Sequence, residues 1–453
     1  MENSLNQYIE LLDDSRSIID AHAPKALNYL RQEAVDAIKA FGRLPKKGDE
    51  GYNDADPHSM LAPDYGLNIS RVNIPADVAA SFRCDIPNVS TLTAVVVGDA
   101  FHPAATLQKN LPDGVEVMSL ARAADLYPDI TAKYLNSLAR NSTPMAALNT
   151  ALLQDGVFIR VRRGVELEKA VQIVNIFSAP ASYMAVRRIL VIAEEASSLR
   201  LLLCDHTQRR DHDYAASQVI EIHAAEGARV ELYDVEESSP RTRRINEIFA
   251  DQKKDSSFSM TSSSLAGGDS LNRIRINLAG EGASAELAAM VIASGERRVD
   301  NNVVLSHAAK HCTSRQLFKY ALFDNARGAF GGKVVVNEGA VRTDAAQTNR
   351  NLLIGDNATM HSDPQLEIYC DDVKASHGAT TGQLDAQALF YMRSRGIPED
   401  EARRMLVQAF MMDVVDSIRL DALRDRMRLL VEKRLGGSDP AASCADCSAA
   451  CKK

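Results

Sequence analysis

Apolar residues in the first 155 positions recur every three or four residues, a spacing that predicts amphipathic helices. The clearest row lies between Pro24 and Gly42, residue types that flank the start and the end of many helices. This row consists of Leu27, Leu30, Ala34, Ala37, Ile38 and Phe41. A polar loop is predicted for 44–64 and a strand for 92–98, followed by an Ala- and Leu-rich helical stretch. No G-x-G-x-x-G motif follows the strand, so the pattern does not indicate a dinucleotide-binding unit.

From about Val157 the pattern changes to short runs of β-branched residues, which are typical of strands. Between these runs a pair of residues ending in alanine keeps returning. The pairs are Glu195-Ala196, Gly227-Ala228, Gly282-Ala283, Gly328-Ala329, Gly339-Ala340, Asn357-Ala358 and Gly378-Ala379. A Gly or Asn permits a tight corner with positive φ, and the Ala leaves room for stacking. Strands and corners that repeat without long helices predict a solenoid, best fitted by a parallel β-helix, with an antiparallel sandwich as the alternative.

Helical periodicity returns near Asp385, whose side chain suits an N-cap, and Gly396 ends the first helix. Pro398 opens a second helix with three acidic residues in its first turn, and a third helix runs up to Gly436. The chain is therefore predicted to be mainly β, with four segments. These are a mostly helical N-terminal domain (1–155), a β-helix core (156–382), a C-terminal helical domain (383–437) and a flexible Cys-containing tail (438–453).

The composition is that of an ordinary globular protein, with 45% hydrophobic and 25% charged residues. The formal net charge of −8 argues against a nucleic-acid-binding surface, which needs a basic stripe. No run of about 18 apolar residues is present, and the first residues do not resemble a signal peptide. We therefore expect a cytoplasmic protein without a membrane span. Tryptophan is absent, so small aliphatic side chains must fill the core, which suits a narrow stacked architecture.

The seven cysteines show no spacing that indicates a disulfide framework. Three of them, Cys444, Cys447 and Cys451, form a C-x2-C-x3-C pattern in the tail. Thiolates in such a pattern bind soft metals or iron–sulfur centres, and an exposed tail without such a role is the alternative.

A second group of potential metal ligands consists of His307, His311 and Cys312. If this segment is extended, His307 and His311 lie about 13 Å apart, too far for one ion. We therefore favour a structural role, unless a turn or a helix brings the two imidazoles together.

The run 366–380, LEIYCDDVKASHGAT, carries a specific resemblance. Together with GQLD at 382–385 and LFYMRSRGIP at 389–398, it resembles the signature of the SufB/SufD family of iron–sulfur cluster assembly proteins. Weaker matches lie at 156–159, 314–319 and 349–353. The resemblance covers the chain well from about 150 to 435 and more loosely before that.

The resemblance implies a right-handed parallel β-helix between two helical domains. It further implies a non-enzymatic scaffold subunit that pairs with a SufB-like subunit through its β-helix. A SufC-like ABC ATPase would dock on the C-terminal helices, in the region from Glu399 to Arg434. The complex would build a transient iron–sulfur cluster and pass it to acceptor proteins.

Within the family, the chain is more similar to SufD than to SufB. SufB carries a reactive cysteine in the stretch that corresponds to 346–351, and this chain has none there. His377 matches the SufD histidine at the interface with SufB, so it is the first candidate for the cluster-assembly interface and for an iron ligand. Many relatives have Cys two residues before this His, where this chain has Ala375.

Cys370 is a weaker candidate ligand. It alternates with Leu366 and Ile368, so the three residues are predicted to share one face of a strand. With two aliphatic companions, that face is expected to point into the core, where the thiol would be buried.

Two other interpretations stay open. The first is a SufB-like scaffold that acts as a homodimer without a separate partner. The second is a β-helix enzyme acting on carbohydrates, which needs clustered carboxylates; single acids such as Glu221 and Glu367 form no convincing pair. No flavin motif is legible, so no redox cofactor and no other firmly bound one is expected.

Overall fold

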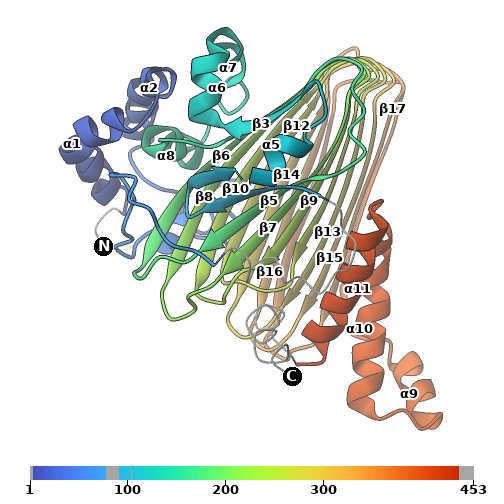
Figure 1. Ribbon diagram of the computed structural model, residues 1–453. Coiled ribbons are helices and arrows are strands. Elements are labelled where there is room, and N and C mark those ends of the chain that lie inside the picture. Colours follow the sequence, from blue (N-terminus) through green and yellow to red (C-terminus); the bar gives the residue numbers. More distant parts are fainter. Residues whose placement is uncertain (1–3, 78–90, 104, 438–453) are drawn as a thin grey trace.

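The structure is a computed structural model that describes residues 4–77, 91–103 and 105–437 (Figure 1). Seven described helices belong to its N-terminal part, and most of them pack on one outer face of a long β-structure (Figure 1). They are α1 (Asn6–Ala21), α2 (Lys25–Phe41), α3 (Pro57–Met60), α5 (Ala105–Asn110), α6 (Leu120–Leu126), α7 (Pro128–Tyr134) and α8 (Pro144–Leu152). The helix predicted before Gly42 is confirmed as α2, and Gly42 ends it in the left-handed conformation with a φ of 73°.

The middle of the chain is a parallel β-solenoid in which successive strands alternate between two sheets. Strands β4 to β18 with even numbers form one sheet, and strands β5 to β19 with odd numbers form the other. The strands are β4 (Val157–Val161), β5 (Val171–Phe177), β6 (Tyr183–Ala193), β7 (Ser198–Thr207), β8 (Tyr214–Ala224), β9 (Arg229–Glu237), β10 (Thr242–Gln252), β11 (Ser257–Ser264), β12 (Ser270–Leu278), β13 (Ser284–Ala293), β14 (Arg298–His307), β15 (Thr313–Leu322), β16 (Arg327–Val336), β17 (Thr343–Leu353), β18 (Thr359–Ile368) and β19 (Val373–Gly382). The predicted parallel β-helix is therefore confirmed, and the parallel registers rule out the antiparallel sandwich.

Three strands of the N-terminal part extend the same two sheets. The predicted strand β1 (Leu92–Val97) pairs in parallel with β5, and β2 (Ala100–Pro103) is its antiparallel neighbour. Strand β3 (Val115–Ser119) pairs antiparallel with β4. The periodicity predicted only the first of these, so the sheets begin before the segment 156–382.

Inside the solenoid, side chains at the same level of successive coils stack on one another. Ile220, Ile248, Ile274 and Val303 share one register across β8, β10, β12 and β14, and all four are buried. β-Branched side chains suit such a column because their χ1 angles are restricted and they pack well on a pleated surface. The core is therefore a narrow stack of aliphatic layers.

The repeated pairs predict a positive φ correctly at Gly227, Gly282 and Gly339 but not at Asn357, and in Glu195-Ala196 the alanine takes it. One column of corners has a left-handed backbone. It consists of Ala196, Gly227, Asp255, Gly282, His311 and Arg342, with φ between 53° and 74°. Each of these residues donates its N–H to a carbonyl of the next coil. The prediction is wrong for Gly328-Ala329 and Gly378-Ala379, which lie inside β16 and β19. Gly328 serves packing instead, because a Cβ there would lie 2.7 Å from the Sδ of Met360.

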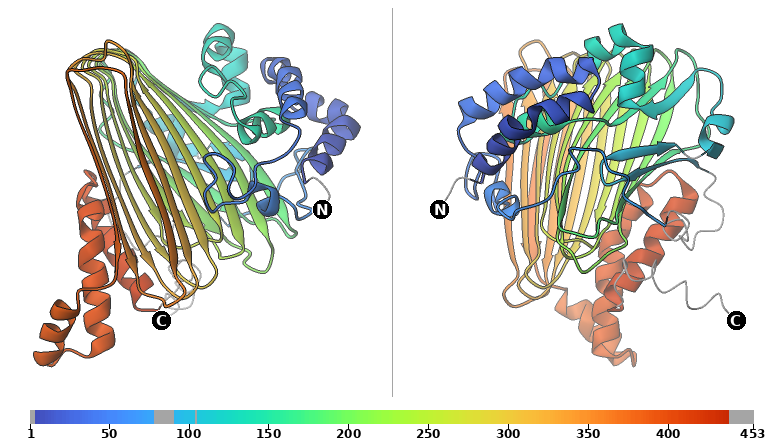
Figure 2. Two further views of the ribbon diagram at one scale, coloured as in Figure 1. Left: turned by 180° about the vertical axis from the view of Figure 1, so that it is seen from behind. Right: turned by 60° about the vertical axis from the view of Figure 1, so that its left-hand side comes forward.

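The C-terminal helices are α9 (Ala386–Ser394), α10 (Glu399–Asp416) and α11 (Asp421–Leu435). The apolar sides of α10 and α11, including Val407 and Met427, pack on the outer face of the odd-numbered sheet (Figure 2). Lys319 of β15 donates to the Phe410 carbonyl at 2.7 Å and pairs with Asp413, which joins α10 to the sheet. Asp385 caps α9 as predicted, since its side chain accepts from the Gln387 N–H at 2.8 Å.

Candidate functional site at the open end of the solenoid

The last coil of the solenoid is uncovered. In the part of the chain that the structure describes, β18 and β19 each have a strand neighbour on one side only. The inner side chains of this coil therefore meet solvent. Ile368 of β18 is in register with Val336 of β16, but Ile368 is 44% exposed whereas Val336 is fully buried. This open end presents both apolar side chains and unpaired strand edges, the features of a surface that another β-structure can continue.

His377 lies on this open end. Its register partner on β17 is Gln347, whose own partner on β15 is Gln316. Gln347 is buried inside the solenoid and donates from Nε2 to Oε1 of Gln316 at 3.1 Å. Because residues in register on a sheet share a face, His377 occupies the inward row of the last strand, and it is exposed there because no further coil covers it.

The row to which His377 belongs is part of a wider set of inward amides that the sequence analysis missed. On the opposite sheet, Gln218 donates to Asn246 at 3.1 Å and Asn272 donates to Asn301 at 2.9 Å. Asn301 in turn donates to the Tyr320 hydroxyl at 2.6 Å. The sequence did contain a signal for this set: Asn or Gln recurs once per coil, at corresponding positions among aliphatic residues. These amides make the solenoid interior partly polar.

Cys370 does not lie in a strand, because β18 ends at Ile368. The predicted common face holds for Leu366 and Ile368, which lie on the inward row of the uncovered coil. Cys370 follows in the turn and is half-buried at the edge of an apolar cluster that includes Val334 and Val336. It is thus neither a fully buried core thiol nor part of the inward row.

The cluster of His307, His311 and Cys312 is divided between core and surface. His307 is buried on the inner face of β14, with its Nε2 2.9 Å from the hydroxyl of Ser314. Burial lowers the pKa of His307 to about 4. His311 is one of the exposed left-handed corners, and Cys312 is buried.

No group of three or more His, Cys, Asp or Glu side chains that could hold a metal ion occurs within the described ranges. The predicted ligands Cys444, Cys447 and Cys451, together with Cys84, lie outside those ranges.

The two single acids considered for an enzyme have structural contacts. Glu221 is fully buried, accepts from the backbone N–H groups of Asn136 and Leu138 at 2.8 and 2.9 Å, and pairs with Arg188 at 2.7 Å. It anchors the N-terminal part to the solenoid. Glu367 pairs with Lys333 at 2.9 Å on the outer face of the last coil. The two carboxylates therefore do not form a site.

The C-terminal helices present a second surface. Most apolar residues of α10 and α11 are used in packing on the sheet, so they do not form an exposed face. By contrast, none of the nine described residues of α9 is buried, and Phe390 and Tyr391 are 72% and 58% exposed. Met405 near the start of α10 is 44% exposed. Three of the exposed apolar side chains within and beside the predicted docking region thus lie on α9 and α10, and a fourth, Leu429 on α11, is 53% exposed.

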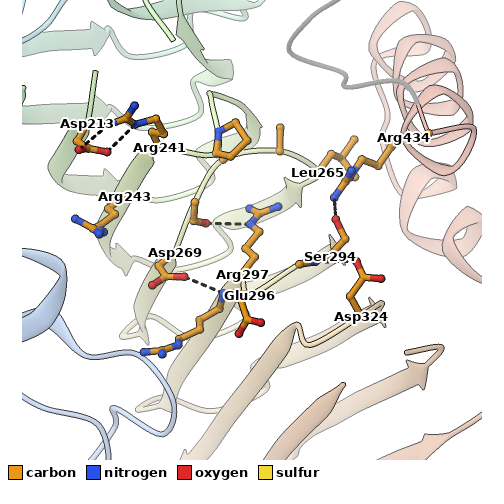
Figure 3. Close-up of a pocket in the computed structure, with 17 residues that line it drawn as sticks. Asp213, Arg241, Arg243, Leu265, Asp269, Ser294, Glu296, Arg297, Asp324 and Arg434 are labelled. Atoms are coloured by element: carbon orange, nitrogen blue, oxygen red, sulfur yellow. Dashed lines mark hydrogen bonds and ion pairs between the residues drawn. The ribbon is translucent and has the colours of Figure 1, made fainter. Parts of the chain in front are cut away.

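A hollow of about 840 Å³ lies where the last turn of α11 meets the corners of the solenoid (Figure 3). Arg434, the end of the predicted docking region, donates to the hydroxyl of Ser294 at 2.6 Å. Arg297 at the floor pairs with buried Glu236 at 2.7 Å, and Arg241 pairs with Asp213 at 2.9 Å. Of these contacts, Arg434–Ser294 joins the helical unit to the solenoid, in addition to Lys319–Asp413, Arg419–Glu286 and Arg426–Glu237.

An uncovered last coil and a projecting helical unit are surfaces of the kind by which a protein contacts other macromolecules. These two features are typical of a subunit of a larger assembly. The chain belongs to the SufB/SufD family: the SUF system FeS cluster assembly SufBD core domain matches residues 176–410, and the SufBD N-terminal region matches residues 2–173. It is a SufD-like member of this iron–sulfur cluster assembly family.

The curated relatives agree with this assignment. An iron–sulfur cluster assembly SufBD family protein of Synechocystis is 28% identical over 89% of this chain and 90% of the relative. The SufD proteins of Bacillus subtilis and Escherichia coli are 26% and 38% identical, over 76% and 35% of this chain and 79% and 38% of the relatives. In the described part of the chain, no helix is both long and apolar enough to cross a membrane. A cytoplasmic location stays a prediction.

Proposed function

We propose that this chain is a non-catalytic scaffold subunit of a Suf-type assembly complex and that its open end pairs with a SufB-like subunit. The observation that carries this proposal is the uncovered last coil, in which Ile368 and His377 occupy rows that are buried in every earlier coil. A second solenoid placed against this end would cover the inward row and pair with the free strand edges. Burial of one such aliphatic side chain contributes roughly 1.5–3 kcal/mol.

The second part of the proposal concerns the helical unit. A SufC-like ATPase would bind the surface formed by α9 and the start of α10, where Phe390, Tyr391 and Met405 are exposed. Aromatic side chains are favoured at the centres of protein interfaces. Because α9 packs on α10 and the solenoid holds α10 through Lys319, movement of the ATPase would be transmitted to the sheet.

The iron–sulfur cluster is the cargo of such a complex, not a resident cofactor. His377 would face the partner across the joined ends, where its imidazole is available to ligate iron. Ala375 occupies the same inward row, so no thiolate is contributed there by this chain. Any thiolate ligands would then come from the partner.

The pairing is tested by co-expression with candidate SufB-like and SufC-like proteins, anaerobic purification and native mass spectrometry. Ile368→Asp would place a charge in the joined surface and is expected to abolish pairing, while the isolated chain keeps its melting temperature. Leu126→Asp is the matched control, because Leu126 is an exposed aliphatic residue on α6, away from the open end. Full assembly with Ile368→Asp would refute pairing through this surface.

The cluster role is tested separately with His377→Ala. His361→Ala is the matched control, since His361 is an exposed histidine of the same coil on the outward side of β18. We expect the complex to form with both variants, but cluster formation, followed by its visible absorption, to fall only with His377→Ala. Unchanged cluster formation would restrict His377 to packing.

The homodimer is the alternative that the same surface allows, because an uncovered end can also meet a second copy. It predicts a native mass of two copies of this chain in the absence of any relative. Such a dimer that also excludes the SufB-like protein would replace the heterodimer as the functional unit.

A further inference from the structure

A pocket of about 400 Å³ lies on the outer face of the even-numbered sheet. Its floor comes from β12, β14, β16 and β18, and the loop that contains residues 48–53 covers one side. The pocket is separate from the open end and from the helical unit, so the proposed function does not account for it.

Two arginines of β12 point into this pocket from positions two residues apart. Arg273 is only 9% exposed, donates to the Gly51 carbonyl at 3.0 Å and lies over the ring of Tyr52. Its nearest carboxylate is Glu247 at 3.5 Å. The covering loop therefore holds Arg273 mainly through neutral groups.

The positive charge of Arg275 is balanced by nearby carboxylates even less than that of Arg273. It donates to the Ile274 carbonyl at 3.1 Å and to the carbonyl and side-chain oxygens of Asn302 at 3.3 and 2.9 Å. Among the described residues it forms no ion pair. Burial and the nearby charge of Arg273 lower the pKa of Arg275 to about 10. A half-buried cation beside a second cation is a place where a bound anion is strongly stabilised.

Apart from Glu247 beside Arg273, the carboxylates around the pocket have other partners or lie at its rim. Asp49 faces Arg43, with both oxygens within 2.9 Å of its guanidinium, and Asp363 accepts from Gln365 at 2.8 Å. Glu50 is exposed at the rim. Lys333 on β16 adds a third cation to the lining, at the rim where it pairs with Glu367.

Gly331 keeps the floor of the pocket flat. A Cβ at this position would lie 2.6 Å from Nδ2 of Asn302 and 3.0 Å from Nδ2 of Asn53. The absence of a side chain therefore lets Asn302 hold Arg275 in place and lets Asn53 of the covering loop approach the sheet.

We propose that this pocket binds a small phosphate-class anion, with Arg273 and Arg275 as its principal ligands. Two forked guanidiniums and an ammonium at the rim offer more donors than a planar carboxylate needs, and they suit a tetrahedral dianion with several acceptor oxygens. The site requires neither a cluster nor a partner subunit. Anion binding can therefore be tested on the isolated chain, whatever the outcome for the proposed function.

The test is isothermal titration calorimetry of the purified full chain at low ionic strength, with inorganic phosphate and pyrophosphate as probes. We expect saturable one-to-one binding that Arg275→Gln weakens at least about tenfold. Arg122→Gln is the matched control, because it removes one exposed arginine on α6 and should leave binding unchanged. Gly331→Ala keeps every charge but displaces Asn302, so it should also weaken binding.

Thermal unfolding shows whether each variant is folded. If Arg275→Gln does not fold, Arg275→Lys and Gly331→Ala carry the test, because both retain the charge. Absence of saturable binding by the unmodified chain would overturn the proposal, as would an equal loss with Arg122→Gln. Equal affinity for malonate would overturn the phosphate class, since it would show that any dianion suffices.

Discussion

The last two coils of this solenoid have the same local structure but different surroundings. Val336 and Ile368 are in register, as are Gln347 and His377, yet the first of each pair is buried and the second is exposed. The difference does not come from strand propensity or residue type, because Val and Ile are interchangeable in strands. It comes from the place of the coil in the stack. A repetitive fold thus exposes its inward residues wherever its repetition stops.

The largest difference between the two coils is expected when the same charged residue is introduced into each of them. Val336→Asp should destabilise the isolated chain by at least about 3 kcal/mol, because a carboxylate is buried without a partner. Ile368→Asp in the same register should change the stability of the isolated chain by less than about 1 kcal/mol. Chemical denaturation followed by circular dichroism measures both. Equal destabilisation would mean that the last coil is covered in the isolated chain.

A second, smaller effect concerns the buried His307 of the middle coils. Its pKa in the folded protein is lowered to about 4, whereas an unfolded chain has the ordinary value near 6.5. Between these values the unfolded state binds the extra proton, so stability is full above pH 6.5 and falls as the pH approaches 4. The expected loss is about 2–3 kcal/mol.

Urea unfolding at pH 7 and pH 4.5 measures this loss. His307→Gln should remove most of this pH dependence, while His361→Gln on the exposed coil should leave it in place. A pH dependence that survives His307→Gln would assign it to other groups.

The smallest expected effect lies in α9, which has no fully buried residue and has Asp385 as its cap. Asp385→Ala should cost about 1 kcal/mol, and only locally, because the cap satisfies N–H groups at the start of the helix. Amide hydrogen exchange should become faster in α9 and stay unchanged in the β-strands. A fall in global stability would show that α9 is more strongly coupled to the solenoid than its exposure indicates.

Much of the fold follows from local patterns. β-Branched runs and corners with positive φ are local signals, and they predicted the solenoid from 157 onwards. Gly328-Ala329 shows the limit of that signal, because a glycine needed for space between coils resembles a glycine needed for a turn. Strands β2 and β3 were missed because they are short; β2 forms a tight hairpin with β1, whereas β3 pairs with β4, about forty positions further along the chain.

The site was predictable only in part. The resemblance indicated His377, but its place on the inward row follows from the register with Gln347, which no local pattern reveals. Cys370 was placed in a strand because alternation was continued two residues beyond the end of β18. The pocket of Arg273 and Arg275 escaped notice because its other half comes from a loop more than two hundred positions away in the sequence.

The corner column also sets a length. Each of the six residues of this column, from Ala196 to Arg342, donates its N–H to a carbonyl of the coil that follows it, so each of these coils is attached to the next in the same way. Consecutive coils are about 4.8 Å apart, the spacing of neighbouring strands. Removing or duplicating one whole coil would therefore move the open end by one such step relative to the N-terminal helices while every remaining corner keeps its bond. The number of coils therefore determines the distance between His377 and the N-terminal end of the solenoid.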